Sequence, residues 1–203
     1  WTGDKIYAAA GYYPFTGAHL TFGTGEFIIG DIVDAYESTV IDINQAHIKT
    51  QTTTVAMSKR VVGVVSSVSA DVEANFKANK TFRIATVTEP YDIIEYNAYK
   101  PEWVDYVQAL VDGGYSEVTT NSLGEGAVNV CNENGNIDNG DYICSSNTPG
   151  KGMRQLEIPI GDLSQSVGMM LNYTVAKALE SVDWLDTTDS SIVTDVNGVK
   201  TKM

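Results

Sequence analysis

Basic residues are scarce in this sequence. Only 13 Lys and Arg residues stand against 26 Asp and Glu residues, so the 203-residue chain has a formal net charge of −13. Nucleic-acid affinity comes mainly from Lys and Arg side chains that neutralise phosphates, so we expect no nucleic-acid partner. No run of about 18 consecutive apolar residues occurs, and we therefore expect no membrane insertion. Hydrophobic residues make up 43% of the chain, which is enough for a core.

Cysteine and histidine are scarce as well, with two residues of each. Cys131 and Cys144 do not make a disulfide framework. They flank a turn-rich segment, and two readings stay open: half-buried thiols in a reducing environment, or a disulfide across a hairpin. A metal site would need His19 or His47 to converge on them, but no Cys-x-x-Cys or His-x₃-His spacing occurs. We expect neither a metal nor a cofactor.

The two ends of the chain indicate a fragment or a processed product. The chain begins at Trp1 without an initiator Met or a signal-like stretch. It ends in VNGVKTKM (196–203), which reads as a strand that follows an Asn-Gly turn and is cut by cleavage or truncation.

Short segments rich in Val, Ile, Thr and aromatic residues dominate the rest, and turn residues bound most of them. Strands are predicted at 27–36, 38–43, 52–57, 60–69, 81–88, 116–120, 127–131, 141–146 and 172–179. Runs this short, at roughly ten-residue spacing, predict an all-β fold: a roll, barrel or sandwich.

One segment has helical periodicity. In residues 101–111 the apolar residues fall at i, i+1, i+4, i+7 and i+8, beginning with Trp103. Pro101 suits a first helical turn, and Gly113-Gly114 suits a helix end. We predict one short amphipathic helix laid against a sheet.

An aromatic-rich excursion surrounds this helix. Tyr96, Tyr99 and Tyr106 are candidates for contact with a host glycan or receptor, provided that they are exposed. The alternative is that these aromatic residues are core or subunit-contact residues.

Two segments of the chain resemble each other. Both 25–35 (GEFIIGDIVDA) and 135–145 (GNIDNGDYICS) read Gly-x₄-Gly-Asp followed by strand formers, and a further strand comes about thirty residues after each. Gly30-Asp31 and Gly140-Asp141 are therefore predicted to be structural turns of a tight hairpin, with Asn139-Gly140 meeting the type I′ requirement. The chain is expected to be a single β-rich domain. Two related lobes at about 16–70 and 117–184, with an insertion at about 71–116, are the organisation that this repeat suggests. Chance similarity between the two segments is the alternative.

The second of these segments lies within a longer pattern. The stretch NSLGEGAVNVCNENGNIDNGDYICSSNTPGKGMRQ, followed by NYTVAKALESVDW, resembles a module of fibre, tail-appendage and surface structural proteins of bacteriophages and large algal viruses. Upstream, Thr16-Gly17-Ala18-His19 and Val62-Gly63-Val64-Val65-Ser66 match more loosely. The resemblance extends from about Thr16 to Trp184.

The resemblance implies a viral structural protein of the virion. Such a module forms a homotrimer, contacts other virion proteins and supports host attachment. It often precedes an intramolecular chaperone that cuts itself away. This chain departs from the pattern because nothing like a chaperone follows residue 184, and because the insertion at 70–115 is longer than in the family.

Several residue groups suggest chemistry, and each has a simpler explanation. His19 could be a general base, with Thr16, Thr21 or Ser122 as nucleophile, but no recognisable motif joins them. A hydrogen-bonded, structural His19 is the simpler reading.

An Asn-Ser bond beside a carboxylate, Asn121-Ser122 with Glu125, suggests self-cleavage. Gly124 and Gly126 are equally well explained as turn formers in this segment.

Asp31 and Asp141 could be the paired carboxylates of a glycan-degrading hydrolase, although each also suits a turn. Oxygen-bearing side chains in 132–138 suggest a calcium loop but lack the EF-hand spacing, so a solvated loop is the simpler reading. These loop residues are Asn132, Glu133, Asn134, Asn136 and Asp138.

We expect no enzyme activity. The favoured hypothesis is a fibre or tail-appendage module, with a hydrolase and a self-cleaving maturation domain as alternatives.

Overall fold

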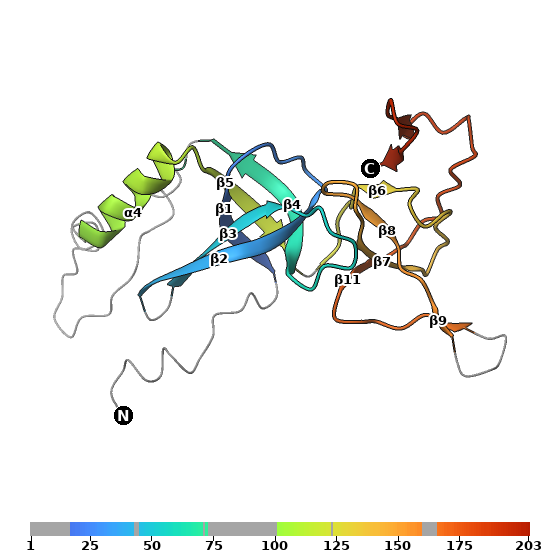
Figure 1. Ribbon diagram of the computed structural model, residues 1–203, viewed down its shortest axis with the longest axis horizontal. Coiled ribbons are helices and arrows are strands. Elements are labelled where there is room, and N and C mark those ends of the chain that lie inside the picture. Colours follow the sequence, from blue (N-terminus) through green and yellow to red (C-terminus); the bar gives the residue numbers. More distant parts are fainter. Residues whose placement is uncertain (1–16, 43–44, 71, 73–100, 123, 160–165) are drawn as a thin grey trace.

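The computed structural model describes residues 17–42, 45–70, 72, 101–122, 124–159 and 166–203. Helix α4 (Pro101–Asp112) lies at one end of the molecule, a five-stranded barrel lies in the middle, and a six-stranded sheet lies at the other end (Figure 1). The predicted all-β class with one short helix is confirmed.

The barrel contains the first five strands. They are β1 (Ala18–Gly23), β2 (Ile32–Asp42), β3 (Gln45–Thr52), β4 (Val61–Ser69) and β5 (Ser116–Asn121). Their order around the closed barrel is β1-β3-β2-β4-β5, with β5 pairing back to β1. Only the β1–β3 pair is parallel. Closure gives every barrel strand a partner on both sides, although residues 37–42 of β2 pair with β3 alone.

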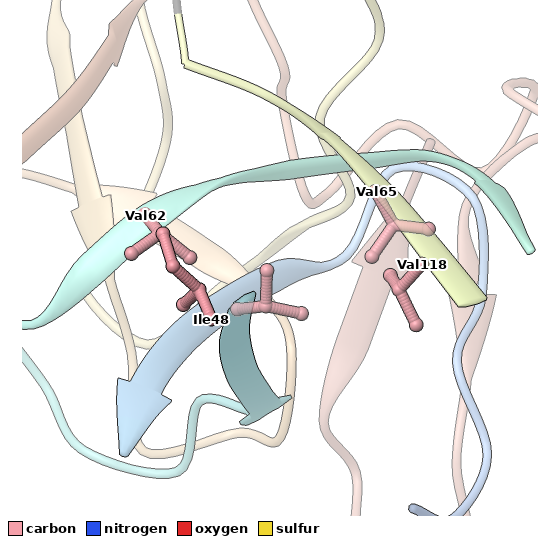
Figure 2. Close-up of a cluster of buried hydrophobic side chains, with 5 residues drawn as sticks. Ile48, Val62, Val65 and Val118 are labelled. Atoms are coloured by element: carbon pink, nitrogen blue, oxygen red, sulfur yellow. The ribbon is translucent and has the colours of Figure 1, made fainter. Parts of the chain in front are cut away.

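The barrel interior is filled by β-branched side chains, because alternate residues of each strand point inward. Figure 2 shows Ile48, Val62, Val65 and Val118 directed toward one another from β3, β4 and β5. Two fully buried threonines, Thr21 and Thr50, complete the interior. The Thr21 hydroxyl donates to the Val118 carbonyl at 2.7 Å and lies 3.1 Å from the Thr50 hydroxyl, so these polar atoms are satisfied.

Helix α4 ends in a Schellman motif. The Tyr115 amide donates to the Leu110 carbonyl and the Gly114 amide to the Val111 carbonyl, both at 3.0 Å, with Gly114 at φ +65°. Leu110 is buried against Phe22 of β1, and Tyr115 packs on the same cluster. The predicted apolar stripe is only partly buried, since Val111 is 44% exposed.

The second sheet has the order β11-β7-β8-β6-β13-β12. Its strands are β6 (Val130–Cys131), β7 (Tyr142–Ser145), β8 (Gly152–Arg154), β11 (Thr174–Lys177), β12 (Val193–Thr194) and β13 (Lys200–Lys202). Two further short strands, β9 (Ile158–Pro159) and β10 (Ser166–Val167), pair with each other. The turn at Asn197-Gly198 joins β12 to β13, so the predicted strand after this turn is confirmed.

The two faces of the second sheet carry separate apolar clusters. Val130 and Ile143 pack with Ile137, Val182 and Trp184. Cys131, Cys144 and Met153 form the other cluster, against which Ala56 of the β3–β4 loop packs.

The two cysteines are free and fully buried, not half-buried. A disulfide across a hairpin is ruled out by strand order, because β8 lies between β6 and β7. Strands two positions apart lie about 10 Å from each other. A disulfide needs Cα atoms within roughly 7 Å.

Two strand predictions are wrong, those at 27–36 and 52–57. Residues 27–31 precede β2 and contain a turn, and residues 53–57 form a loop instead of a strand. The amides of Ala56, Met57 and Ser58 bond to residues 145–147, so they cannot join a ladder in the barrel. Strand β3 also covers residues 45–51, where no strand was predicted. The strand predicted at 81–88 lies outside the described residues.

The two Gly-Asp segments have the same local structure. Asp31 donates its amide to the Ile28 carbonyl, and Asp141 to the Asp138 carbonyl, both at 3.0 Å. Gly30 then pairs with Val65 in the way that Gly140 pairs with Ala178: the glycine amide donates to that residue's carbonyl, and that residue's amide donates to the following aspartate carbonyl.

The type I′ prediction for Asn139-Gly140 is wrong. Gly30 and Gly140 have φ of +90° and +100°, but Asn139 and Ile29 do not have positive φ, which matches a type II turn. Each turn begins a strand, β2 or β7, whose antiparallel partner is the later strand β4 or β11. Neither is a two-residue hairpin.

The sheets divide the chain differently from the predicted lobes. Strand β5 falls in the predicted second lobe, at about 117–184, yet it closes the barrel. The boundary between barrel and second sheet falls after Asn121.

Candidate functional site

A buried polar cluster lies where the barrel meets the second sheet. We call Asp31, Asn129 and Lys151 the Asp31 cluster. Asn129 Nδ2 donates to Asp31 Oδ1 at 2.6 Å and to the Ile29 carbonyl at 3.0 Å, and Lys151 Nζ donates to the same Oδ1. Asp31 is 3% exposed, Asn129 6%, and the Lys151 side chain 16%. Three different segments therefore meet at one carboxylate oxygen.

Main-chain hydrogen bonds fix these three segments. The Asn129 amide donates to the Gly30 carbonyl at 2.8 Å, and the Gly152 amide donates to the Asn129 carbonyl at 2.7 Å. The Ile32 amide donates to the Gly150 carbonyl at 2.8 Å. Because every segment is held through its backbone, the positions of the three side chains do not depend on flexible loops.

Two glycines enclose the Asp31 cluster. A Cβ at Gly30 would lie 3.0 to 3.1 Å from Nδ2, Cγ and Oδ1 of Asn129. A Cβ at Gly150 would lie 2.5 Å from Asp31 Oδ2, and this residue has φ +71°. Gly30 thus has a second role beyond the predicted turn, because it leaves room for the Asn129 amide.

A second buried carboxylate, Asp34, lies in β2 nearby in sequence. Ser58 Oγ donates to both Asp34 oxygens at 2.8 and 3.0 Å, and Arg60 Nη2 lies 3.5 Å from Oδ2. The Ser58 amide donates to Ser145 Oγ of β7 at 2.8 Å, and Ser145 Oγ donates to the Val55 carbonyl at 2.8 Å. This arrangement fastens the β3–β4 loop to both the barrel and the second sheet.

The predicted calcium-loop residues hold strands instead of converging on one point. Asn132 Oδ1 accepts the Lys200 amide, the Glu133 carboxylate accepts two N–H groups of Asn147, and Asn134 Nδ2 donates to the Arg154 carbonyl. Asn136 Oδ1 accepts the Trp184 amide. Among the residues that the structure describes, no group of three or more His, Cys, Asp or Glu is placed to hold a metal ion.

Burial also affects the thiol of Cys144. It raises the pKa of this thiol to about 11, with smaller contributions in the same direction from Glu133 and Cys131. The thiol form therefore dominates at neutral pH, and a thiolate is needed for nucleophilic attack or metal binding.

The predicted nucleophiles are separate in the structure. Thr21 is bonded inside the barrel, and Ser122 Oγ donates to the Val62 carbonyl at 2.5 Å. His19 lies in β1, and its Nε2 is buried without a hydrogen-bond partner, so the hydrogen-bonded His19 that we expected is not seen. Thr16 lies outside the described residues, whereas Glu125 is exposed.

The predicted carboxylate pair is not brought together either. Asp31 belongs to the Asp31 cluster, whereas Asp141 Oδ2 accepts the Asp138 amide within its own turn. The Asp141 side chain thus has the turn role that the simpler explanation expected, whereas the Asp31 side chain bonds to residues far away in the sequence.

The predicted glycan contacts are only partly covered by the structure. Tyr96 and Tyr99 lie outside the described residues, and Tyr106 lies in α4. Their contact with a glycan stays a prediction.

Sequence reasoning missed Asn129 and Lys151. Both lie inside the segment that resembles viral modules, but they lie 98 and 120 positions from Asp31, so no local spacing points to the cluster. The sequence signal for the cluster is a glycine directly before Asp31, which is Gly30, and another directly before Lys151, which is Gly150.

Comparison with known proteins gives no match: no family model, curated protein or solved structure is similar to this chain. In the described part of the chain, no helix has both the length and the apolar character needed to cross a membrane.

Proposed function

We propose that this protein is a structural module of a viral fibre or tail appendage, and that it assembles as a homotrimer on the virion. The observation that carries this proposal is that buried polar groups of the protein join the barrel to the second sheet. Asp31, Asp34 and Ser145 all bond across the boundary between barrel and second sheet or to the loop that spans it. Such bonding suits a protein that bears load. The viral setting rests on the sequence resemblance.

The surface of the second sheet supports assembly. Strands β11 and β12 are its edges, and in the described residues no strand pairs with their outer sides. Large apolar side chains near these edges are exposed, among them Leu179 at 74% and Val193 at 63%. Open edges and exposed apolar groups are features that subunit contacts cover.

The solution mass tests the assembly. Light scattering is expected to give about three times 21.9 kDa. Leu179→Lys is expected to lower that mass, because it places a charge on the surface that we assign to subunit contact. Val68→Lys in β4, which replaces a residue that is 39% exposed on the barrel, is the matched control and should leave the mass unchanged. A monomeric wild-type protein would contradict the proposal.

Host attachment is assigned to the aromatic excursion. Joint alanine substitution of Tyr96, Tyr99 and Tyr106 is expected to abolish binding to host cells while the solution mass stays the same. Unchanged binding would remove this part of the proposal.

A further inference from the structure

The Asp31 cluster contains the parts of a covalent cross-link. Lys151 supplies a primary amine, Asn129 supplies a carboxamide, and Asp31 supplies a carboxylate that contacts both. We propose that Lys151 Nζ forms an intramolecular isopeptide bond with Cγ of Asn129, with Asp31 as the proton-transfer group and ammonia as the leaving group.

The reacting nitrogens lie close together. Lys151 Nζ and Asn129 Nδ2 both bond to Asp31 Oδ1. Two donors on one oxygen lie within about 5 Å of each other. Holding a nucleophile beside its target in this way replaces a bimolecular encounter by an intramolecular step. The nucleophile and the leaving nitrogen therefore share one proton-transfer group.

The amide of Asn129 is oriented for attack on one face. Nδ2 donates both to Asp31 Oδ1 and to the Ile29 carbonyl, and these two acceptors fix which end of the amide carries the nitrogen. A Cβ at Gly30 would lie at nearly equal distances from Nδ2, Cγ and Oδ1, so Gly30 covers one face of the amide. In the proposed step the amine therefore attacks Cγ from the opposite face.

The reaction balances without an oxidant or a cofactor. Asp31 takes one proton from the Lys151 ammonium, and the free amine adds to Cγ of Asn129. The second proton of the attacking nitrogen passes to Nδ2, the Cγ–Nδ2 bond breaks, and ammonia departs. It leaves as ammonium once it takes the proton that Asp31 holds. One C–N bond forms, one C–N bond breaks, and Asp31 returns to the carboxylate.

Burial favours this reaction over hydrolysis. Asp31 and Asn129 are each more than nine-tenths buried, and Gly150 packs directly against Asp31. A site that excludes water strengthens the proton-transfer contacts and keeps competing water away from the amide carbon. The bond would join the segment before β6 to the loop before β8 at the point where both contact the barrel.

Intact mass under denaturing conditions tests the proposal. The wild-type protein is expected to be lighter than its sequence mass by one ammonia. Lys151→Arg keeps the positive charge but removes the amine nucleophile, and is expected to show the full mass. Asp31→Asn is also expected to show the full mass. Lys177→Arg, an exposed lysine in β11, is the matched control and should keep the mass loss.

Peptide mapping locates the bond. Cleavage after glutamate under reducing conditions separates residues 126–133 from residues 134–157, because Glu125, Glu133 and Glu157 border them. The cross-link is expected to hold these two peptides together through Asn129 and Lys151. Reduction removes any disulfide between the two peptides, each of which carries one cysteine.

Three outcomes would overturn the proposal. The first is a wild-type protein of full sequence mass. The second is an ammonia loss that maps to an Asn-Gly pair, which indicates a succinimide. The third is a loss of water with a link between Asp31 and Lys151. A cross-link that persists in Asp31→Asn would overturn the role of that carboxylate.

Discussion

The barrel closes on itself, whereas the second sheet has two open edges in the described residues. The barrel interior is one cluster of β-branched side chains from four of its strands. The second sheet instead splits its apolar residues between two faces and relies on Asn, Ser and Asp side chains to hold its strands. Closure lets strands stabilise each other through a shared interior, and an open sheet of very short strands needs specific polar contacts in addition.

The turn-rich segment 134–150 shows how polar contacts hold the short strands of the second sheet. Asn134 Nδ2 donates to the Arg154 carbonyl, and Asn139 Nδ2 donates to the Leu179 carbonyl. The Gly135 carbonyl accepts Trp184 Nε1 at 2.8 Å. The polar residues of this segment thus replace the long ladders that its short strands cannot provide.

Trp184→Ala should have the largest effect. Trp184 is 4% exposed, packs with Val130 and Ile143, and donates to the Gly135 carbonyl. Loss of a buried tryptophan costs about 3–5 kcal/mol of unfolding free energy. Hydrogen exchange should show loss of protection in the second sheet, whereas the closed barrel keeps its protection.

Leu185→Ala is the matched control for this substitution, because the adjacent Leu185 is 80% exposed. It should leave exchange unchanged in both regions. Equal loss of protection in barrel and sheet after Trp184→Ala would contradict the expectation that the barrel stays folded without the second sheet.

Val118→Ala tests whether damage to the barrel also destabilises the second sheet. Val118 is fully buried in the barrel interior, and its truncation should cost roughly 2 kcal/mol. Because the Asp31 and Asp34 contacts of the second sheet depend on β2, the sheet should lose protection together with the barrel. Retained protection in the sheet would show that the sheet does not need the barrel. Val68→Ala in the exposed part of β4 is the control.

The sequence predicted the elements whose signals are local. Strands β4 and β5 have the expected composition, and α4 has both its apolar period and its Gly113-Gly114 end. Strand β3 was missed because one of its inward positions beside Ile48 is Thr50, a polar residue in the core. Residues 53–57 were read as a strand from their Thr and Val content, but their amides bond to the second sheet.

The candidate site could not be predicted from local signals, because its side-chain contacts join residues far apart in the sequence. Asp31 was assigned to a turn, and this is correct for its backbone, which bonds to Ile28. Its side chain is bonded to residues about a hundred positions away. Such contacts depend on how the sheets meet, and no periodicity in the chain specifies that.

Glu117→Gln should have the smallest effect on stability. It distinguishes Glu117, a buried acid of the barrel, from Asp31 and Asp34, the buried acids at the boundary between barrel and second sheet. Asp31 and Asp34 each contact a cation, whereas Glu117 of β5 is 8% exposed and its Oε2 has no hydrogen-bond partner. Burial raises the pKa of Glu117 above its ordinary value of 4.5. Between that value and the higher folded pKa, the folded protein holds more protons than the unfolded chain, so stability falls as pH rises through this window.

Replacing Glu117 with neutral glutamine removes this cost of ionisation. At pH 7 the variant should be more stable by about 1 kcal/mol, and the gain should disappear below pH 4.5, where the carboxyl is protonated in both states. Urea unfolding at both pH values measures this. Asp34→Asn is the contrasting variant: it should destabilise at pH 7, because Asp34 accepts two hydrogen bonds from Ser58 and contacts Arg60. A loss of stability in Glu117→Gln at pH 7 would mean that the barrel carboxylate is paired as well as those at the boundary.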